Sequence, residues 1–193
     1  MKYWKISFMS LLILFFIVIT QSSAKTDFEK SHPEVFGIPI GAEKDRIHKI
    51  FSEAHIPLKL STDSVEVYSQ SVIKLNYLKE VGLYYVNGKL AKILFKFSPP
   101  IDPNAQTADF ILGFYKKIRT FLIRSYGEPT NSIYYIHPNF YYKLVALETG
   151  NAYLFDFWEN AEGMRVLLYL KGKDMSINFG LAYEDISLFE KEE

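Results

Sequence analysis

Residues 80–97, EVGLYYVNGKLAKILFKF, predict a β-hairpin, and this hairpin indicates the class of the whole fold. Two runs rich in apolar and aromatic residues, 80–86 and 89–97, flank the dipeptide Asn87-Gly88. Asn-Gly is the pair most typical of a tight type I′ turn between antiparallel strands. The sequence therefore predicts an antiparallel sheet built from hairpins.

The same stretch predicts the register and the two faces of the hairpin. A turn centred on that dipeptide pairs Tyr84 with Ala91 and Val81 with Leu94. Strand alternation then places Lys92 and Lys96 on a solvated face, opposite a buried face formed by Ala91, Ile93, Phe95 and Phe97.

Two helices are predicted, one before and one after the hairpin. Apolar residues recur at 47, 50, 51 and 54, the spacing of one helical face, and Pro57 ends this first helix. A short strand is predicted around residues 64–69. A longer helix begins near Thr107 and ends at Gly-Glu-Pro, residues 127–129. Its apolar stripe consists of Ile111, Phe114, Tyr115, Ile118, Phe121, Leu122 and Tyr126.

Five strands are predicted after the second helix. Their ranges are 132–136, 141–148, 152–158, 164–170 and 176–183. Two short segments between them, 148–151 and 160–163, have the Asn- and Gly-containing composition of hairpin turns.

The order of elements predicts an α+β fold of two α-β-β-type halves, with an antiparallel sheet and helices packed on one face. Prolines at 99, 100 and 103 separate the halves, because proline lacks the N–H that a strand ladder needs. A single sheet can run through both halves. The predicted division is a signal peptide (1–24), a polar leader (25–35), the first half (36–98), a proline-rich joint (99–106), the second half with extra strands (107–187) and a charged tail (188–193).

The N-terminus has the layout of a secretory signal. Lys2 and Lys5 precede an apolar stretch at 6–20, and small residues lead up to Ala24, after which we expect cleavage. As a helix, the apolar stretch is roughly 22 Å long, which is short of the ~30 Å hydrocarbon core of a bilayer. The expected location is periplasmic or secreted. The alternative is an uncleaved tether to the inner membrane through residues 6–24.

Composition favours an exported bacterial protein without a nucleic-acid partner. Without residues 1–24 the chain has 169 residues and a formal net charge of −2, so it offers no basic field for nucleic acid. There is no cysteine, which argues against a disulfide-stapled secreted module and against a lipid-modified N-terminus. The 49% hydrophobic content suits one domain, or two small halves that share a core.

One known family resembles parts of this sequence. The segment FGIPIGAEKDRI at 36–47, a helix ended by proline, and LYYVNGKLAKI at 83–93 resemble the SmpA/OmlA type of outer-membrane assembly lipoprotein. That family shares its α-β-β unit with the β-lactamase-inhibitor proteins, in which the unit occurs in tandem. This chain departs from the pattern, because it lacks the lipid-accepting cysteine and ends its first helix in Ala-His-Ile-Pro rather than Gly-x-Pro. The resemblance implies a small non-catalytic protein that binds another envelope protein.

No motif for catalysis, a metal or a cofactor is present. The sequence contains no His-Glu-x-x-His, no Gly-x-Ser-x-Gly and no phosphate-binding loop. His48 and His55 are spaced to share one side of a helix, so a metal site remains an alternative to two solvated histidines. We therefore predict no catalytic, metal-binding or cofactor-binding residue.

Asp156 is the most informative polar residue. The predicted alternation places it beside Leu154 and Trp158, and across a hairpin from Lys143. A turn at 149–150 puts Lys143 opposite Asp156, whereas a turn at 150–151 puts it opposite Trp158. Asp156 is then either a carboxylate of raised pKa that handles a ligand or half of an exposed ion pair.

These observations predict an exported, non-catalytic protein-binding or envelope-structural module. Its partner is expected to be another envelope protein, and the membrane takes part only if the N-terminal segment is uncleaved. Candidate contacts on the solvated sheet face are Lys92, Lys96, Lys143, Asp156 and Trp158. The alternative is a small-molecule carrier or enzyme with a pocket between sheet and helices. Tyrosines and phenylalanines near 134–142 either stack on a ligand or fill the core.

Overall fold

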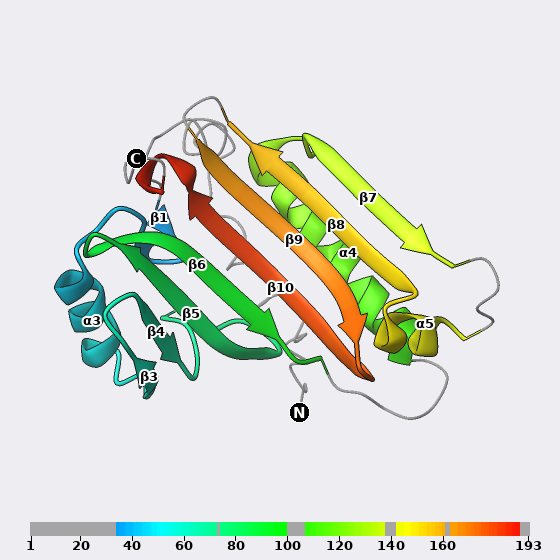
Figure 1. Cartoon of the computed structure of the whole chain (residues 1–193), viewed down its shortest axis with the longest axis horizontal. Coiled ribbons are helices and arrows are strands. Elements are labelled where there is room, and N and C mark those ends of the chain that lie inside the picture. The colour runs from blue at the N-terminus through cyan, green and yellow to red at the C-terminus, as the bar shows by residue number, and fades with distance from the viewer. Residues whose placement is uncertain (1–33, 73, 100–106, 138–141, 161–162, 190–193) are drawn as a thin grey trace, which may run out of the picture.

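The chain folds into one large antiparallel sheet with helices packed on it, so the predicted α+β class is confirmed (Figure 1). The computed structural model describes residues 34–72, 74–99, 107–137, 142–160 and 163–189. The predicted signal peptide and most of the predicted joint lie outside these residues. The sheet order is β3-β4-β5-β6-β10-β9-β8-β7, and a separate two-stranded ribbon pairs β1 with β2.

The elements succeed one another as follows. They are β1 (Glu34–Val35), β2 (Ile38–Pro39), α3 (Lys44–Glu53), β3 (Leu58–Ser61), β4 (Val65–Tyr68), β5 (Leu78–Val86), β6 (Lys89–Phe97), α4 (Thr107–Tyr126), β7 (Asn131–Ile136), α5 (Lys143–Thr149), β8 (Ala152–Glu159), β9 (Met164–Lys173), β10 (Ser176–Asp185) and a 3-10 turn (Ile186–Leu188).

The hairpin of β5 and β6 forms as predicted, but its register differs by one residue. Tyr84 pairs with Lys92 and Val81 with Phe95, because a β-bulge at Ala91 inserts an extra residue. The bulge allows two successive residues, Leu90 and Ala91, to be buried together. An alternating strand would have turned one of them toward solvent.

Both predicted helices form, and each buries its apolar face. In α3, Ile47 and Phe51 are buried, and Phe51 packs on Tyr68 of β4 with ring centroids 4.1 Å apart. In α4, Ile111, Tyr115 and Leu122 are buried. These contacts hold the helices against the sheet.

The predicted strand at 141–148 is wrong, because residues 143–149 form the helix α5. Gly150 ends α5 in the left-handed conformation (φ 80°), so 148–151 is a helix end and not a hairpin turn. The apolar run is short, and such runs fit either a strand or a helix. Gly172 of β9 provides the room for α5, since a Cβ there would overlap the carbonyl oxygen of Leu147.

Both halves have the same architecture: a helix followed by four antiparallel strands. The last strands, β6 and β10, pair with each other at the centre, so the sheet is continuous (Figure 1). Each long helix ends in the same way. His55 (φ 55°) and Gly127 (φ 83°) both take the left-handed conformation two residues before a proline.

The register assigns residues to the two faces of the sheet. Cross-strand pairing links Tyr68 of β4 through Val81, Phe95, Leu181 and Leu168 to Asp156 of β8, and all these side chains are buried beneath the helices. Along each strand, the residues that alternate with these buried ones point to the opposite face of the sheet. No helix of the described residues covers that face, which is called the open face below. Figure 1 views the molecule from that side, with α4 behind the strands.

Candidate functional site

The predicted contact residues do not lie on one surface. Lys92 and Lys96 are on the open face, where Lys96 pairs with Glu80 at 2.8 Å. Asp156 (0% exposed) and Trp158 (1%) lie on the opposite, helix-covered face. The expectation that these two share an exposed face with the lysines is therefore wrong, because the aromatic side of β8 faces solvent and its Asp156 side faces α4.

Lys143 lies elsewhere again. It begins α5 and pairs with Asp109 of α4, with Nζ and Oδ1 2.9 Å apart. Since the strand at 141–148 does not exist, neither predicted pairing of Lys143, with Asp156 or with Trp158, occurs. The pair with Asp109 is exposed and ties α5 to α4.

Asp156 accepts hydrogen bonds from side chains on two elements, α4 and β7. Tyr115 of α4 donates to it at 2.8 Å and Tyr134 of β7 at 2.6 Å, and the hydroxyl of Ser132 donates to the same carboxylate. The Nε of Arg119, also on α4, lies 3.2 Å away. The carboxylate is therefore fully occupied by the protein, which makes it a structural anchor for α4 and the edge strand β7.

Burial and the carboxylate together fix the protonation state of these tyrosines. Burial, followed by the negative charge of Asp156, raises the pKa of Tyr115 well above its ordinary value. The pKa of Tyr134 is raised by burial and then by its hydrogen bond to Asp156. Both phenols remain donors at neutral pH.

A second buried carboxylate occupies the equivalent strand of the first half. Glu66 of β4 (1% exposed) accepts hydrogen bonds from Tyr68 at 3.0 Å and Tyr85 at 2.9 Å. His48 of α3 and Ser61 of β3 complete its surroundings, at 3.3 and 3.4 Å. Each half thus has a buried acid on its second strand, contacted by a serine of its first strand and a basic side chain of its helix. Sequence reasoning missed Glu66 and the partners of Asp156, because these residues are far apart in the chain.

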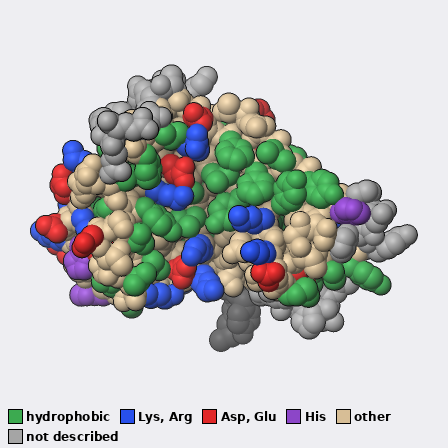
Figure 2. All heavy atoms as spheres, in the orientation of Figure 1, with side chains coloured by type: hydrophobic (Ala, Val, Ile, Leu, Met, Phe, Trp, Pro, Cys, Tyr) green, Lys and Arg blue, Asp and Glu red, His purple; other side chains and the backbone are tan. Residues whose placement is uncertain are grey.

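The open face carries a row of aromatic side chains. Tyr153, Phe155 and Phe157 of β8 are half-buried, and Phe155 stacks on Tyr169 of β9 with ring centroids 6.3 Å apart. Tyr135 of β7 stacks on Tyr153 at 5.1 Å. These five residues are called the aromatic row. Figure 2 shows a continuous patch of hydrophobic side chains on this side of the molecule, over β7 to β9.

Two of the basic residues near the aromatic row are paired with acids, and a third is not. Lys92 pairs with Glu184, and Arg165 pairs with Glu159 at 3.1 Å, in one line across the sheet. Lys171, opposite Tyr153, has no ion pair with a described residue, and its Nζ lies 5.9 Å from the centre of the Tyr169 ring. Toward the centre of the sheet the side chains are small, because this part of the face carries Gly82, Gly180 and Ala182, and the ring of Tyr169 lies over Gly180.

The predicted aromatic cluster around 134–142 is exposed where it is described. Tyr134 is 51% exposed and Tyr142 75%. Phe140 and Tyr141 lie outside the described residues. The expectation that this cluster fills the core is therefore wrong for the tyrosines that the structure describes.

The described residues contain neither a group of metal ligands nor a helix suited to cross a membrane. In the described ranges, no three His, Cys, Asp or Glu side chains are grouped so that they could hold a metal ion. His55 lies beyond the end of α3, while His48 contacts Glu66. No helix among the described elements has the length and apolar character that crossing a bilayer requires.

The comparisons with known proteins give no family for this chain. Neither the models of protein families, nor the curated proteins, nor the solved structures contain a match to it. The candidate site is the open face, with the aromatic row over β7, β8 and β9.

Proposed function

We propose that the chain is an exported, non-catalytic protein that binds another envelope protein on the open face of its sheet. The aromatic row supports this proposal. Contiguous exposed apolar patches are uncommon on monomeric proteins and usually mark sites of association. Aromatic side chains also dominate the energetics of protein interfaces.

The arrangement of the row suits binding without a conformational change. Phe155 lies within ring contact of Tyr153, Phe157 and Tyr169, so these side chains are ordered before a partner arrives. A rigid aromatic surface loses little side-chain entropy on association. The partner that fits is a protein with an apolar, convex segment.

The surrounding charges predict weak salt dependence. Lys92, Lys96 and Arg165 each have an acidic partner within the chain. Because paired rim charges contribute little attraction for a partner and Lys171 adds a single unpaired charge, we expect the affinity to depend only modestly on ionic strength.

Site-specific photocrosslinking in the native envelope tests this proposal. A photoreactive phenylalanine analogue at Tyr153 should give one defined adduct, whereas the analogue at Phe110, exposed on α4, should not. In the Tyr153 background, Phe155→Ser should abolish the adduct while the purified protein keeps a cooperative melt. Adducts of equal yield from both positions, or an adduct that survives Phe155→Ser, would refute docking on this face.

Export has its own test. N-terminal sequencing of the protein from the envelope fraction should begin at Lys25. An intact Met1 in a membrane fraction would mean that the N-terminal segment is uncleaved and tethers the protein to the membrane. Recovery of the uncleaved chain from the cytoplasm would overturn export altogether.

A further inference from the structure

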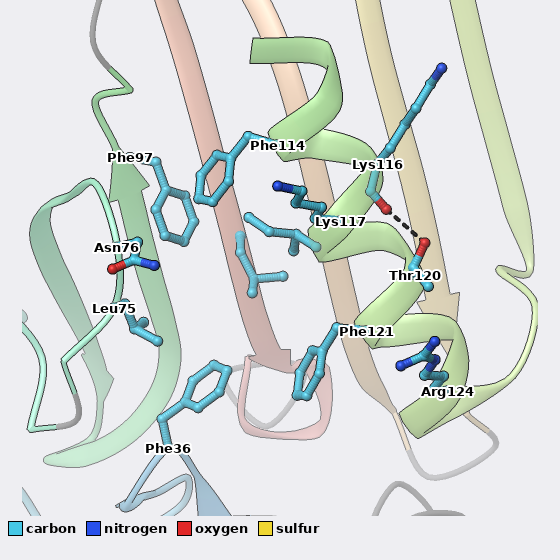
Figure 3. A pocket seen from close by; sticks show the side chains of 12 residues that line it. Phe36, Leu75, Asn76, Phe97, Phe114, Lys116, Lys117, Thr120, Phe121 and Arg124 are labelled. Atoms are coloured by element: carbon cyan, nitrogen blue, oxygen red, sulfur yellow. Dashed lines mark hydrogen bonds between the residues drawn. The ribbon is translucent and has the colours of Figure 1, made fainter. Parts of the chain in front are cut away.

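A cavity of about 540 Å³ lies between α4 and the sheet, on the side opposite the aromatic row (Figure 3). Its volume is within the roughly 300–1,000 Å³ typical of small-molecule sites. Its apolar lining comes from α4, β6, β10 and the segments beside β1 and β5, and consists of Phe36, Leu75, Phe97, Phe114, Ile118, Phe121 and Leu181.

Besides Lys116, two basic side chains of α4, Lys117 and Arg124, add charge to this apolar lining. Figure 3 shows Lys117 directed into the space between α4 and the segment that carries Leu75 and Asn76. Arg124 lines the end where Phe36 and Phe121 lie. No acidic residue is part of the described lining.

These two cations differ from most of the other basic residues near the sheet. Lys92, Lys96 and Arg119 each pair with an acid. Lys117 and Arg124 make no hydrogen bond or ion pair to any described residue. An unpaired positive charge beside an apolar cavity is complementary to a ligand with an apolar body and one anionic end.

We propose that this cavity binds a single-chain fatty acid, with its hydrocarbon among the phenylalanines and its carboxylate near Lys117 and Arg124. Burial of each methylene of the ligand is favourable, so its contact with the apolar lining supplies the larger share of the affinity. The cations select for the acid over a neutral lipid, because a carboxylate forms charge-assisted hydrogen bonds with them. A fatty acid carries one negative charge, which two unpaired cations are sufficient to match. The site is independent of the open face, since the sheet separates the two.

Displacement of cis-parinaric acid from the full chain measures this binding, because the fluorescence of this fatty acid rises when it leaves water. Oleate should displace the probe at least tenfold more effectively than oleyl alcohol, which has the same chain without the charge. Asn76→Trp, a change at an exposed position beside the cavity, should reduce probe binding at least tenfold by filling the entrance.

A lysine on the other side of the sheet provides the matched control. Lys117→Glu should weaken oleate binding at least tenfold, whereas Lys171→Glu should change it less than twofold, because Lys171 lies on the open face and is not part of the cavity lining. Both lysines are exposed, so both variants should melt like the wild-type chain. Equal effects of the two substitutions, or equal displacement by oleate and oleyl alcohol, would refute the charge selection. Probe binding that Asn76→Trp leaves unchanged would mean that the ligand is held elsewhere, including on the apolar stretch 6–20, and would overturn the site.

Discussion

Replacing Asp156 by Asn should destabilise the fold far more than the loss of an ordinary ion pair. The carboxylate receives hydrogen bonds from Tyr115, Tyr134 and Ser132 and an ion pair from Arg119, and it is fully buried. An Asn side chain keeps one acceptor oxygen, but its NH₂ group cannot receive the hydrogen bonds and the ion pair that the second carboxylate oxygen receives. The ion pair with Arg119 is therefore lost, and the hydroxyls that face the NH₂ group must turn from donors into acceptors.

The expected loss in unfolding free energy follows from the surroundings of the Asp156–Arg119 pair. Removing one partner of a buried ion pair typically costs about 3–5 kcal/mol. Arg119 is 29% exposed and lies 3.7 Å from Glu128, so part of its charge is compensated. The loss in unfolding free energy should therefore be near the lower limit, about 3 kcal/mol.

Urea denaturation of the full chain at neutral pH, followed by circular dichroism, measures the difference. The control is Glu159→Gln, which breaks an exposed pair with Arg165 and should cost about 0–1 kcal/mol. Adding Arg119→Met to Asp156→Asn should restore part of the stability, because the unpaired cation is removed. If Asp156→Asn costs no more than Glu159→Gln, the carboxylate does not anchor α4 and β7, and the structural role assigned to it is wrong.

Three further predictions concern backbone and pH. His55→Gly should raise the unfolding free energy by about 1 kcal/mol, because His55 holds a left-handed conformation that glycine adopts without strain; an unchanged urea midpoint would count against it. Gly172→Ala should lower the unfolding free energy by about 1–3 kcal/mol or more, because the new methyl group displaces α5. Gly113→Ala in α4 has nothing within 4 Å of the new methyl group and should raise the unfolding free energy by about 1 kcal/mol. Urea melts that rank the two variants in the opposite order would refute the packing of α5. Burial raises the pKa of Tyr115 and Tyr183 above the unfolded value of about 10. The stability that these two phenols contribute should therefore be constant below about pH 10 and fall above it, as the unfolded state releases protons. Absorbance at 295 nm should show these phenols ionising only on unfolding, and ionisation of every tyrosine in the folded state would contradict it.

The sequence predicts elements well where one local signal is strong. The turn at Asn87-Gly88 and the apolar stripe of α4 are each encoded by residues close together in the sequence, and both form at the expected residues. Residues 143–149 had no such signal, since their apolar run, 144–147, is only four residues long and fits a strand as well as a helix. The close packing of this helix depends on Gly172, more than twenty residues away.

The face of each strand was harder to predict than its position. In β8 the aromatic residues face solvent and Asp156 faces the core, although a simple ranking of polarity gives the reverse. In β4 the same happens with Glu66, which is buried between two half-exposed valines. Each acid is tolerated inside because tyrosine hydroxyls and a basic side chain of a helix contact it there, and most of these partners come from distant segments. The cavity beside α4 depends on five separate segments and has no sequence signal at all.

The central pairing of β6 with β10 has a consequence for the origin of the chain. Each of these strands is the last of its own meander, and they meet antiparallel, which is the relation that a two-fold axis normal to the sheet produces. Two identical half-length polypeptides could therefore build the same eight-stranded sheet as a symmetric dimer. Joining them in one polypeptide removes the concentration dependence of that assembly, and it frees the two copies to diverge, so that one could acquire the aromatic row while the other did not.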